Sequence, residues 1–230
     1  MSILACSAQK SNGWLDKLHD GPRKDENVRV NGYLHPGYVE SLAEFGTPRE
    51  LPRCGGWILE RQIPGFSDHD AMGCYPLFCC QDWSQLSTDL EDLADELVSL
   101  SVVTDPFGEY EPACLQRCFK DVVVPFKKHY VADLRLPLNS IGGRRHRKHG
   151  RRALRRVEVE VCPEPTQFIE EWVALYDTLV ERHNISGIPA FSRAAFAKQL
   201  AIPGMAVVSR YNIHRRMAEV VNRIILKPFA

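Results

Sequence analysis

The stretch TDLEDLADELVSLSVVT, residues 88–104, predicts a helix followed directly by a strand. Thr88 with Glu91 three residues later forms a capping box, a usual helix start. Apolar residues then recur at helical spacing, at Leu90, Leu93, Ala94 and Leu97. The β-branched run 100–104 is typical of a strand, and Asp105-Pro106 ends it with a turn.

The flanking segments continue this alternation of strands and helices. Residues 57–63 and 71–80 have the composition of strands, and Pro76 places the second at a sheet edge or at a bulge. A helix is predicted over 112–121 and a strand near 126–134. This order predicts an α/β (α+β) fold, a mixed sheet with flanking helices.

The second half of the chain also predicts strands that alternate with helices. Residues 157–161, Val-Glu-Val-Glu-Val, alternate strictly between apolar and acidic, which predicts a strand. An amphipathic helix is predicted to begin at Thr166 and a shorter one at Ser192. Residues 205–208 are predicted to form the next strand.

The composition is that of an ordinary globular protein, because 44% of the residues are hydrophobic and 25% are charged. No run reaches the ~18 apolar residues needed to cross a bilayer. Residues 1–10 also lack the basic start and apolar stretch of a signal peptide. We therefore predict a cytoplasmic protein without a membrane span.

The eight cysteines include no C-x-x-C pair. This absence argues against a zinc ribbon or a thioredoxin-type motif. Buried free thiols, which pack as small hydrophobic groups, are the favoured interpretation. His146 and His149 lie three residues apart, but the arginines around them disfavour a metal cation. No metal site is predicted.

The net charge of zero conceals one strongly basic segment. Eight positive charges fall within thirteen residues, at Arg144, Arg145, Arg147, Lys148, Arg151, Arg152, Arg155 and Arg156. If residues 141–156 are helical, a narrow stripe remains that carries Gly142, His146, Gly150, Ala153 and Val157. These small residues predict that the stripe lies close to the body of the protein. Gly150 costs a helix about 1 kcal/mol relative to Ala, so the helix needs tertiary support.

Two interpretations of this basic helix stay open. The planar guanidinium of arginine matches phosphate oxygens, which favours an anion site. A solvated helix that offsets the acidic remainder of the chain is the alternative. If the helix is a site, the best candidates for contact with an acyl donor or another polyanion are Arg144, Arg145, Arg147, Lys148, Arg151 and Arg152.

A few other polar residues are weaker candidates. Asp82 and Asp105 fall at the ends of predicted strands, where catalytic groups often lie, although turn and capping roles explain Asp105 equally well. Tyr75 and Tyr130 could donate protons during acylation of an amine. The basic cluster 127–129 is predicted to be surface. We assign no catalytic residue.

Several segments, taken in order, resemble the first lobe of FemAB-like proteins. They are Tyr75-Pro-Leu-Phe-Cys-Cys-Gln-Asp-Trp83, Asp89-Leu-Glu91, Leu97-Val-Ser-Leu100, Val103-Thr-Asp-Pro-Phe-Gly108 and Asp121-Val-Val-Val-Pro-Phe-Lys127. The arginine-rich helix and the following valine–glutamate strand are similar to the start of a second lobe of the GNAT acetyltransferase type. The resemblance covers roughly residues 55–210.

The resemblance implies a function and a division into domains. FemAB-like proteins have two GNAT-like lobes and transfer an acyl group to an amine. Their donor is acyl-CoA, such as acetyl-CoA, or an aminoacyl-tRNA. The chain would thus be an N-acyltransferase, possible partners being an amine-bearing acceptor and tRNA. Residues 51–138 would form the first lobe and 139–230 the N-terminal part of the second, with 1–50 an uncertain leader.

The end of the chain departs from the GNAT pattern. No R/Q-x-x-G-x-G/A loop, which would hold the CoA pyrophosphate at a helix start, occurs in the sequence. Gly142-Gly143 precedes a helix but lacks that glycine spacing. We therefore expect a second lobe that is truncated, or whose last ~20 residues are unrelated sequence. A non-catalytic module that binds RNA or another polyanion, and an inactive fragment, are the alternatives.

Overall fold

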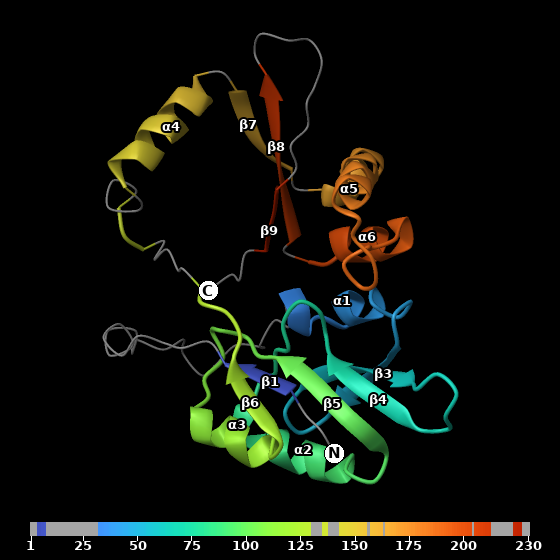
Figure 1. Cartoon of the computed structure of the whole chain (residues 1–230). Helices are drawn as coiled ribbons and strands as arrows, with labels where there is room; N and C mark the ends of the chain where they lie inside the picture. Colours follow the sequence, from blue (N-terminus) through green and yellow to red (C-terminus); the bar gives the residue numbers. More distant parts are fainter. Residues whose placement is uncertain are drawn as a thin grey trace.

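The computed structural model describes residues 4–7, 32–129, 135–137, 143–155, 157–162, 164–203, 205–212 and 223–226. They form a six-stranded mixed sheet with helices on both faces and a second, three-stranded sheet (Figure 1). The predicted fold class, a mixed sheet with flanking helices, is confirmed.

The first sheet has the strand order β2-β3-β4-β5-β1-β6. Its strands are β1 (Leu4–Ser7), β2 (Thr47–Leu51), β3 (Gly56–Gln62), β4 (His69–Gly73), β5 (Leu97–Val103) and β6 (Val122–Pro125). The strands β2, β3 and β4 pair antiparallel, whereas β4, β5, β1 and β6 run parallel. The N-terminal 50 residues, left uncertain by the sequence, thus supply β1 and most of β2.

Two predicted strands differ from those observed. β4 ends at Gly73, so the strand expected over 71–80 is wrong beyond that residue. Pro76 has no N–H to donate to a ladder, and Phe78 then makes only an isolated parallel bridge to Thr104. The strand expected near 126–134 is found earlier, as β6. Residues 126–129, which follow β6, are exposed and belong to no strand, and 130–134 lie outside the described residues.

The capping box predicted at Thr88 is wrong. A 3₁₀ turn, η3 (Trp83–Gln85), leads into helix α2 (Leu86–Asp92), so Thr88 lies inside the helix. Asp82 caps η3 by accepting a hydrogen bond from the Ser84 N–H at 2.9 Å, whereas Gln85, the N-cap residue of α2, makes no side-chain capping bond. The helix therefore begins earlier than the Thr88–Glu91 spacing suggested.

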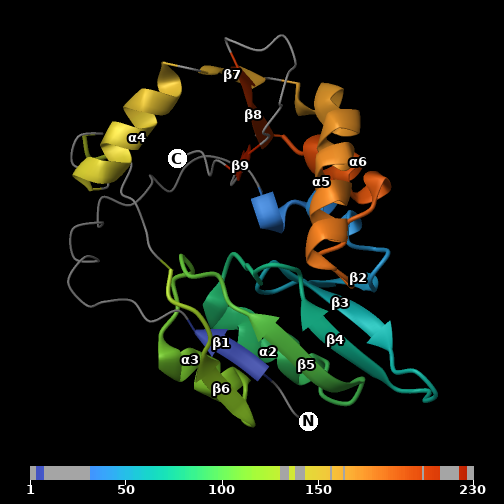
Figure 2. The same cartoon turned by 45° about the horizontal axis from the view of Figure 1, so that its top comes forward.

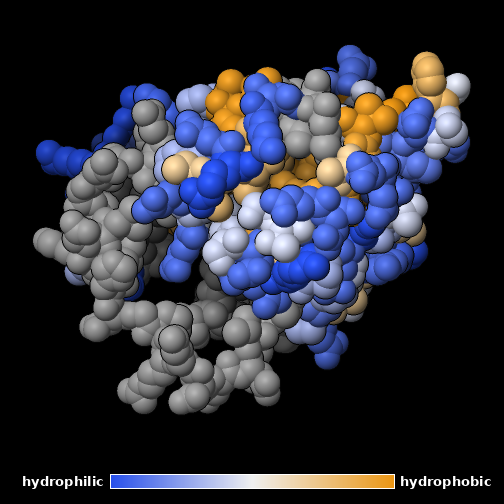
Figure 3. Space-filling model, turned by 90° about the horizontal axis from the view of Figure 1, so that it is seen from below, coloured by the Kyte–Doolittle hydropathy of each residue, from blue (hydrophilic) through white to orange (hydrophobic). Residues whose placement is uncertain are grey.

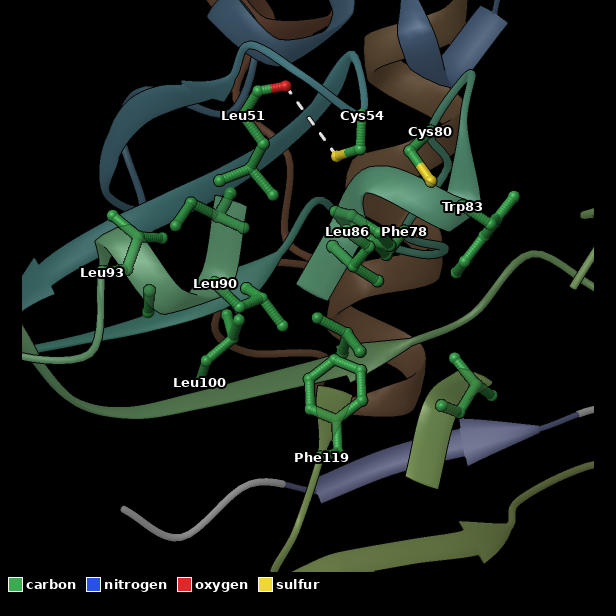
Figure 4. Packing of buried hydrophobic residues seen from close by; sticks show 14 of the residues in the cluster. Leu51, Cys54, Phe78, Cys80, Trp83, Leu86, Leu90, Leu93, Leu100 and Phe119 are labelled. Carbon is green, nitrogen blue, oxygen red and sulfur yellow. Dashed lines mark hydrogen bonds between the residues drawn. The ribbon is translucent and has the colours of Figure 1, made fainter. Parts of the chain in front are cut away.

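One face of the first sheet packs against α2 and α3 (Pro112–Cys118). The helix predicted over 112–121 is therefore found, but it ends at Cys118. Figure 4 shows the side chains of this core, among them Phe78, Leu86, Leu90, Leu100 and Phe119. The outer surface on the side of these helices, seen from below in Figure 3, is largely hydrophilic.

A buried carboxylate ties α2 to the loop between β2 and β3. Asp89 accepts hydrogen bonds from the backbone N–H of Cys54 at 2.7 Å and of Arg53 at 3.2 Å. The Arg53 guanidinium also contacts it at 3.3 Å, which compensates the buried charge. Asp89 is thus a structural residue.

The opposite face of the sheet packs against elements from both halves of the chain. Ile58 and Leu59 are consecutive on β3, so their side chains enter different cores. The core around Leu59 includes α1 (Pro36–Glu40) and α6 (Arg193–Leu200). Ser192 caps α6 by accepting a hydrogen bond from the Ala195 N–H, which confirms the helix start predicted there. Beside α6 lies α5 (Ile169–His183), preceded by the 3₁₀ turn η4 (Pro165–Phe168).

The second sheet is antiparallel, in the order β7-β8-β9. It consists of β7 (Val157–Cys162), β8 (Met205–Asn212) and β9 (Arg223–Leu226). The strands predicted at 157–161 and 205–208 are confirmed. Because β9 pairs with β8, part of the last twenty residues belongs to this sheet. The division into two lobes at residue 138 stays a prediction.

Candidate functional site

The six basic candidates all lie on α4 (Arg144–Leu154), a helix within the range 141–156 considered above. An α-helix turns about 100° per residue, so the six positions share roughly half of the circumference. Arg147 is half-buried, and the remaining five side chains are exposed: Arg144, Arg145, Lys148, Arg151 and Arg152. The fold therefore presents them as one surface, called here the basic face of α4.

Five of these basic side chains have no carboxylate partner among the described residues. No carboxylate among the described residues lies within 4.0 Å of the basic groups of Arg144, Arg145, Lys148, Arg151 or Arg152. The ion pairs that occur elsewhere, such as Arg61–Asp70 at 3.0 Å, lie on the first sheet and its helices. A row of cations in this state attracts anions.

The packing expected for the other side of α4 is wrong. No residue of α4 is buried, and Leu154 is 63% exposed. A Cβ added to Gly150 would meet no atom within 4 Å. The physical reason is position: α4 contacts mainly β7, the next strand, and stands away from the helices of the body (Figures 1 and 2). The stripe of small residues therefore has no packing surface among the described residues.

A second candidate site is a pocket of about 330 Å³ beside the carboxyl end of β5. Asp82 and Asp105 both line it, because the parallel bridge between Phe78 and Thr104 aligns the two loops. The other lining residues are Cys80, Gln81, Trp83, Ser84, Phe107, Gly108 and Glu109. Carboxyl ends of parallel strands are a common place for ligands in α/β proteins.

Both aspartates of this pocket have roles in its turns. Asp82 accepts hydrogen bonds from the Ser84 N–H and, at 2.6 Å, from the Ser84 hydroxyl, and these bonds lower the pKa of its carboxyl group. Asp105 accepts a hydrogen bond from the Phe107 N–H at 2.9 Å. The turn role predicted for Asp105 is therefore observed. Trp83, Phe107 and Glu109 were missed, since no local pattern distinguishes them.

Cys79 lies next to this pocket and was not singled out by its sequence. Burial raises the pKa of its thiol well above the ordinary range, and the negative charge of the nearby Asp105 raises it further. Burial likewise raises the pKa of the nearby Tyr33 to about 12. Both groups are therefore neutral at physiological pH, and Cys79 lacks the thiolate that a nucleophile requires.

The remaining candidates are placed as follows. Tyr75 belongs to an aromatic cluster with Phe191, and its backbone carbonyl accepts a hydrogen bond from the Tyr38 hydroxyl at 2.7 Å. Tyr130 lies outside the described residues. Residues 127–129 are exposed, as predicted.

The described residues also bear on metals and membranes. Within the ranges that the structure describes, no three His, Cys, Asp or Glu side chains are grouped so that they could hold a metal ion. Seven of the eight cysteines, those outside β1, are free thiols. No described helix is long and apolar enough to span a bilayer.

The connection from β5 to α3 does not fit a CoA pyrophosphate. In GNAT-like sites a glycine loop between a strand and a helix holds this group. Here the connection from β5 to α3 carries Asp105, Glu109 and Glu111, which would repel phosphate. Gly143 precedes α4, but Gly142 and the residues just before it lie outside the described part.

Comparison with protein-family models, with curated proteins and with solved structures finds no match to this chain. The resemblance to FemAB-like proteins therefore stays a prediction.

Proposed function

We propose that this chain binds RNA through the basic face of α4. The observation that carries the proposal is the row of exposed basic side chains without a carboxylate partner among the described residues. At 1.5 Å per residue, the eleven residues of α4 span roughly 16 Å. A row of charges of this length matches a series of phosphates better than a single small phosphorylated cofactor.

The opposite side of α4 argues against a membrane as the partner. An interfacial helix needs an apolar face that enters the lipid. The positions opposite the basic face are His146, Gly150 and Ala153, which provide little apolar area. The helix is therefore suited to electrostatic contact with a phosphate backbone, where arginine binds two oxygens at once.

RNA is preferred over DNA because of the FemAB resemblance. Proteins of that kind can take their acyl group from an aminoacyl-tRNA. A cytoplasmic location, which the sequence predicts, would also give access to tRNA.

Transfer of an acyl group to an amine is the second candidate function. The pocket beside β5 favours it, because Asp82, Asp105 and Glu109 line the pocket and no basic residue does. Such a lining suits a cationic amine, the acceptor that an N-acyltransferase needs. In this case α4 would hold the RNA part of the donor, and positioning of the amine would supply most of the acceleration.

Calorimetric titration of the full chain with tRNA and, separately, with acetyl-CoA tests both candidates. We expect tRNA to bind with an affinity that falls steeply with salt, since about six phosphate contacts give a slope of roughly −4 to −5 in log K against log salt. Acetyl-CoA should give no saturable heat. Saturable binding of acetyl-CoA alone would contradict the RNA proposal and support a CoA-dependent acyltransferase. A DNA duplex of similar length shows whether the surface prefers RNA.

A further inference from the structure

We propose that the helix α4 is only marginally stable in the free chain and that RNA stabilises it, so that folding of this helix and recognition of RNA are coupled. The proposal rests on the function proposed above and specifies how that surface is regulated. It follows from the contribution of each source of helix stability in α4: length, composition, charge, capping and packing.

The length and composition of α4 disfavour an independent helix. α4 has eleven residues, and isolated helices shorter than ~12–15 residues are marginal in water even when rich in alanine. Gly150 lies in its interior, where glycine lowers the equilibrium constant for helix formation about fivefold relative to alanine. The backbone alone thus favours the unfolded segment.

The charges of α4 also oppose the helix. Residues three or four positions apart face each other, and like charges there are destabilising. Pairs of this kind, leaving Arg147 aside, are Arg144–Lys148, Lys148–Arg152, Arg145–Lys148 and Lys148–Arg151. The helix dipole gives little net effect, because Arg144 and Arg145 lie at its positive end in the first turn and Arg151 and Arg152 at its negative end in the last turn. Gly143, the N-cap residue, provides no side-chain hydrogen bond.

Packing does not compensate for these terms in the described part of the chain. The comparison with α6 is direct, because α6 is shorter, at eight residues. α6 has Ser192 as a cap and buries four of its residues: Ala195, Phe196, Gln199 and Leu200. α4 buries none. The stabilisation that α6 receives from the core must therefore come to α4 from a partner.

Phosphates of an RNA would supply that stabilisation. Bound between the arginine side chains, they convert the repulsion within the basic face into attraction and release condensed counterions. Basic segments of this kind commonly fold when they bind RNA. The observed association constant is then the intrinsic one multiplied by the fraction of chains in which α4 is already helical.

Two substitutions change this fraction without changing any charge. Gly150→Ala adds a Cβ that meets no atom within 4 Å, so it alters helix propensity alone. We expect tRNA to bind up to about fivefold more tightly to this variant. Ala153→Gly, at an exposed position, should weaken binding by about the same factor.

Hydrogen exchange of the full chain, with and without tRNA, measures the folding of α4 directly. Without RNA, the amides of residues 148–154 should exchange at least about tenfold faster than those of α6, and saturating tRNA should slow them selectively. The proposal would be wrong if these amides were as protected as α6 in the free chain. It would also be wrong if tRNA bound equally well to Gly150→Ala, Ala153→Gly and the unmodified chain. Absence of tRNA binding would instead refute the RNA function itself, and the exchange rates of the free chain would still report whether α4 is folded.

Discussion

Replacing Arg144, Lys148 and Arg151 together by glutamine should weaken tRNA binding about 100-fold at moderate salt. The three side chains occupy the centre of the basic face of α4, and none of them has a carboxylate partner among the described residues. Loss of a phosphate contact weakens binding to all RNA sequences about equally, and it lowers the slope of log K against log salt by about one. The triple variant should therefore show a slope smaller by about three, measured by titration between low and moderate salt.

The matched control removes three charges elsewhere on the surface. Lys120, Lys127 and Lys128 are exposed and lie outside α4, so their replacement by glutamine makes the same change in net charge. This control should alter tRNA affinity by less than about threefold, since nonspecific attraction depends only weakly on distant charges. Equal losses in the two triple variants would mean that net charge, and not the basic face, drives binding.

Phe78→Ala should lower the free energy of unfolding by about 3–5 kcal/mol, the usual cost of removing a buried aromatic ring. Phe78 is 1% exposed and packs edge-to-face with Trp83 at a centroid distance of 5.7 Å. Its ring packs against Gly56, where an added Cβ would lie 2.9 Å from the Cζ atom of the ring. Urea unfolding followed by tryptophan fluorescence measures the change.

Phe107→Ala is the control for this substitution, because Phe107 is 68% exposed. Its replacement should change the free energy of unfolding by no more than about 0.5 kcal/mol. If Phe78→Ala were as mild as Phe107→Ala, the packing of the first core would be different from that described. The Phe78–Thr104 bridge, which aligns the pocket loops, would then also be in doubt.

Local patterns in the sequence predicted several elements correctly. The alternating residues 157–161 form β7, and Ser192 caps α6, because each signal depends on neighbouring residues alone. β1 was not predicted, since its place between β5 and β6 depends on pairing with strands about a hundred residues away. The start of α2 was predicted too late, because Asp82 caps the 3₁₀ turn that leads into the helix and Thr88 lies inside it.

The candidate site shows the same limit. The basic residues of α4 could be predicted to share a helix face, since spacing decides this. The sequence also suggested that the small residues opposite would pack against the body, but packing depends on which element lies opposite. The pocket is a further example, because its loops at 80–84 and 105–109 meet only through the parallel arrangement of β4 and β5.

Ultraviolet crosslinking of bound tRNA, followed by mass spectrometry of the crosslinked peptides, tests the central claim most directly. α4 contains no glutamate, so digestion after glutamate leaves the helix intact within one fragment, and fragmentation then locates the crosslinked residue. The account predicts crosslinks within residues 144–154, lost in the Arg144, Lys148 and Arg151 triple variant. Crosslinks that lie on the first sheet or its helices, with none on α4, would contradict it.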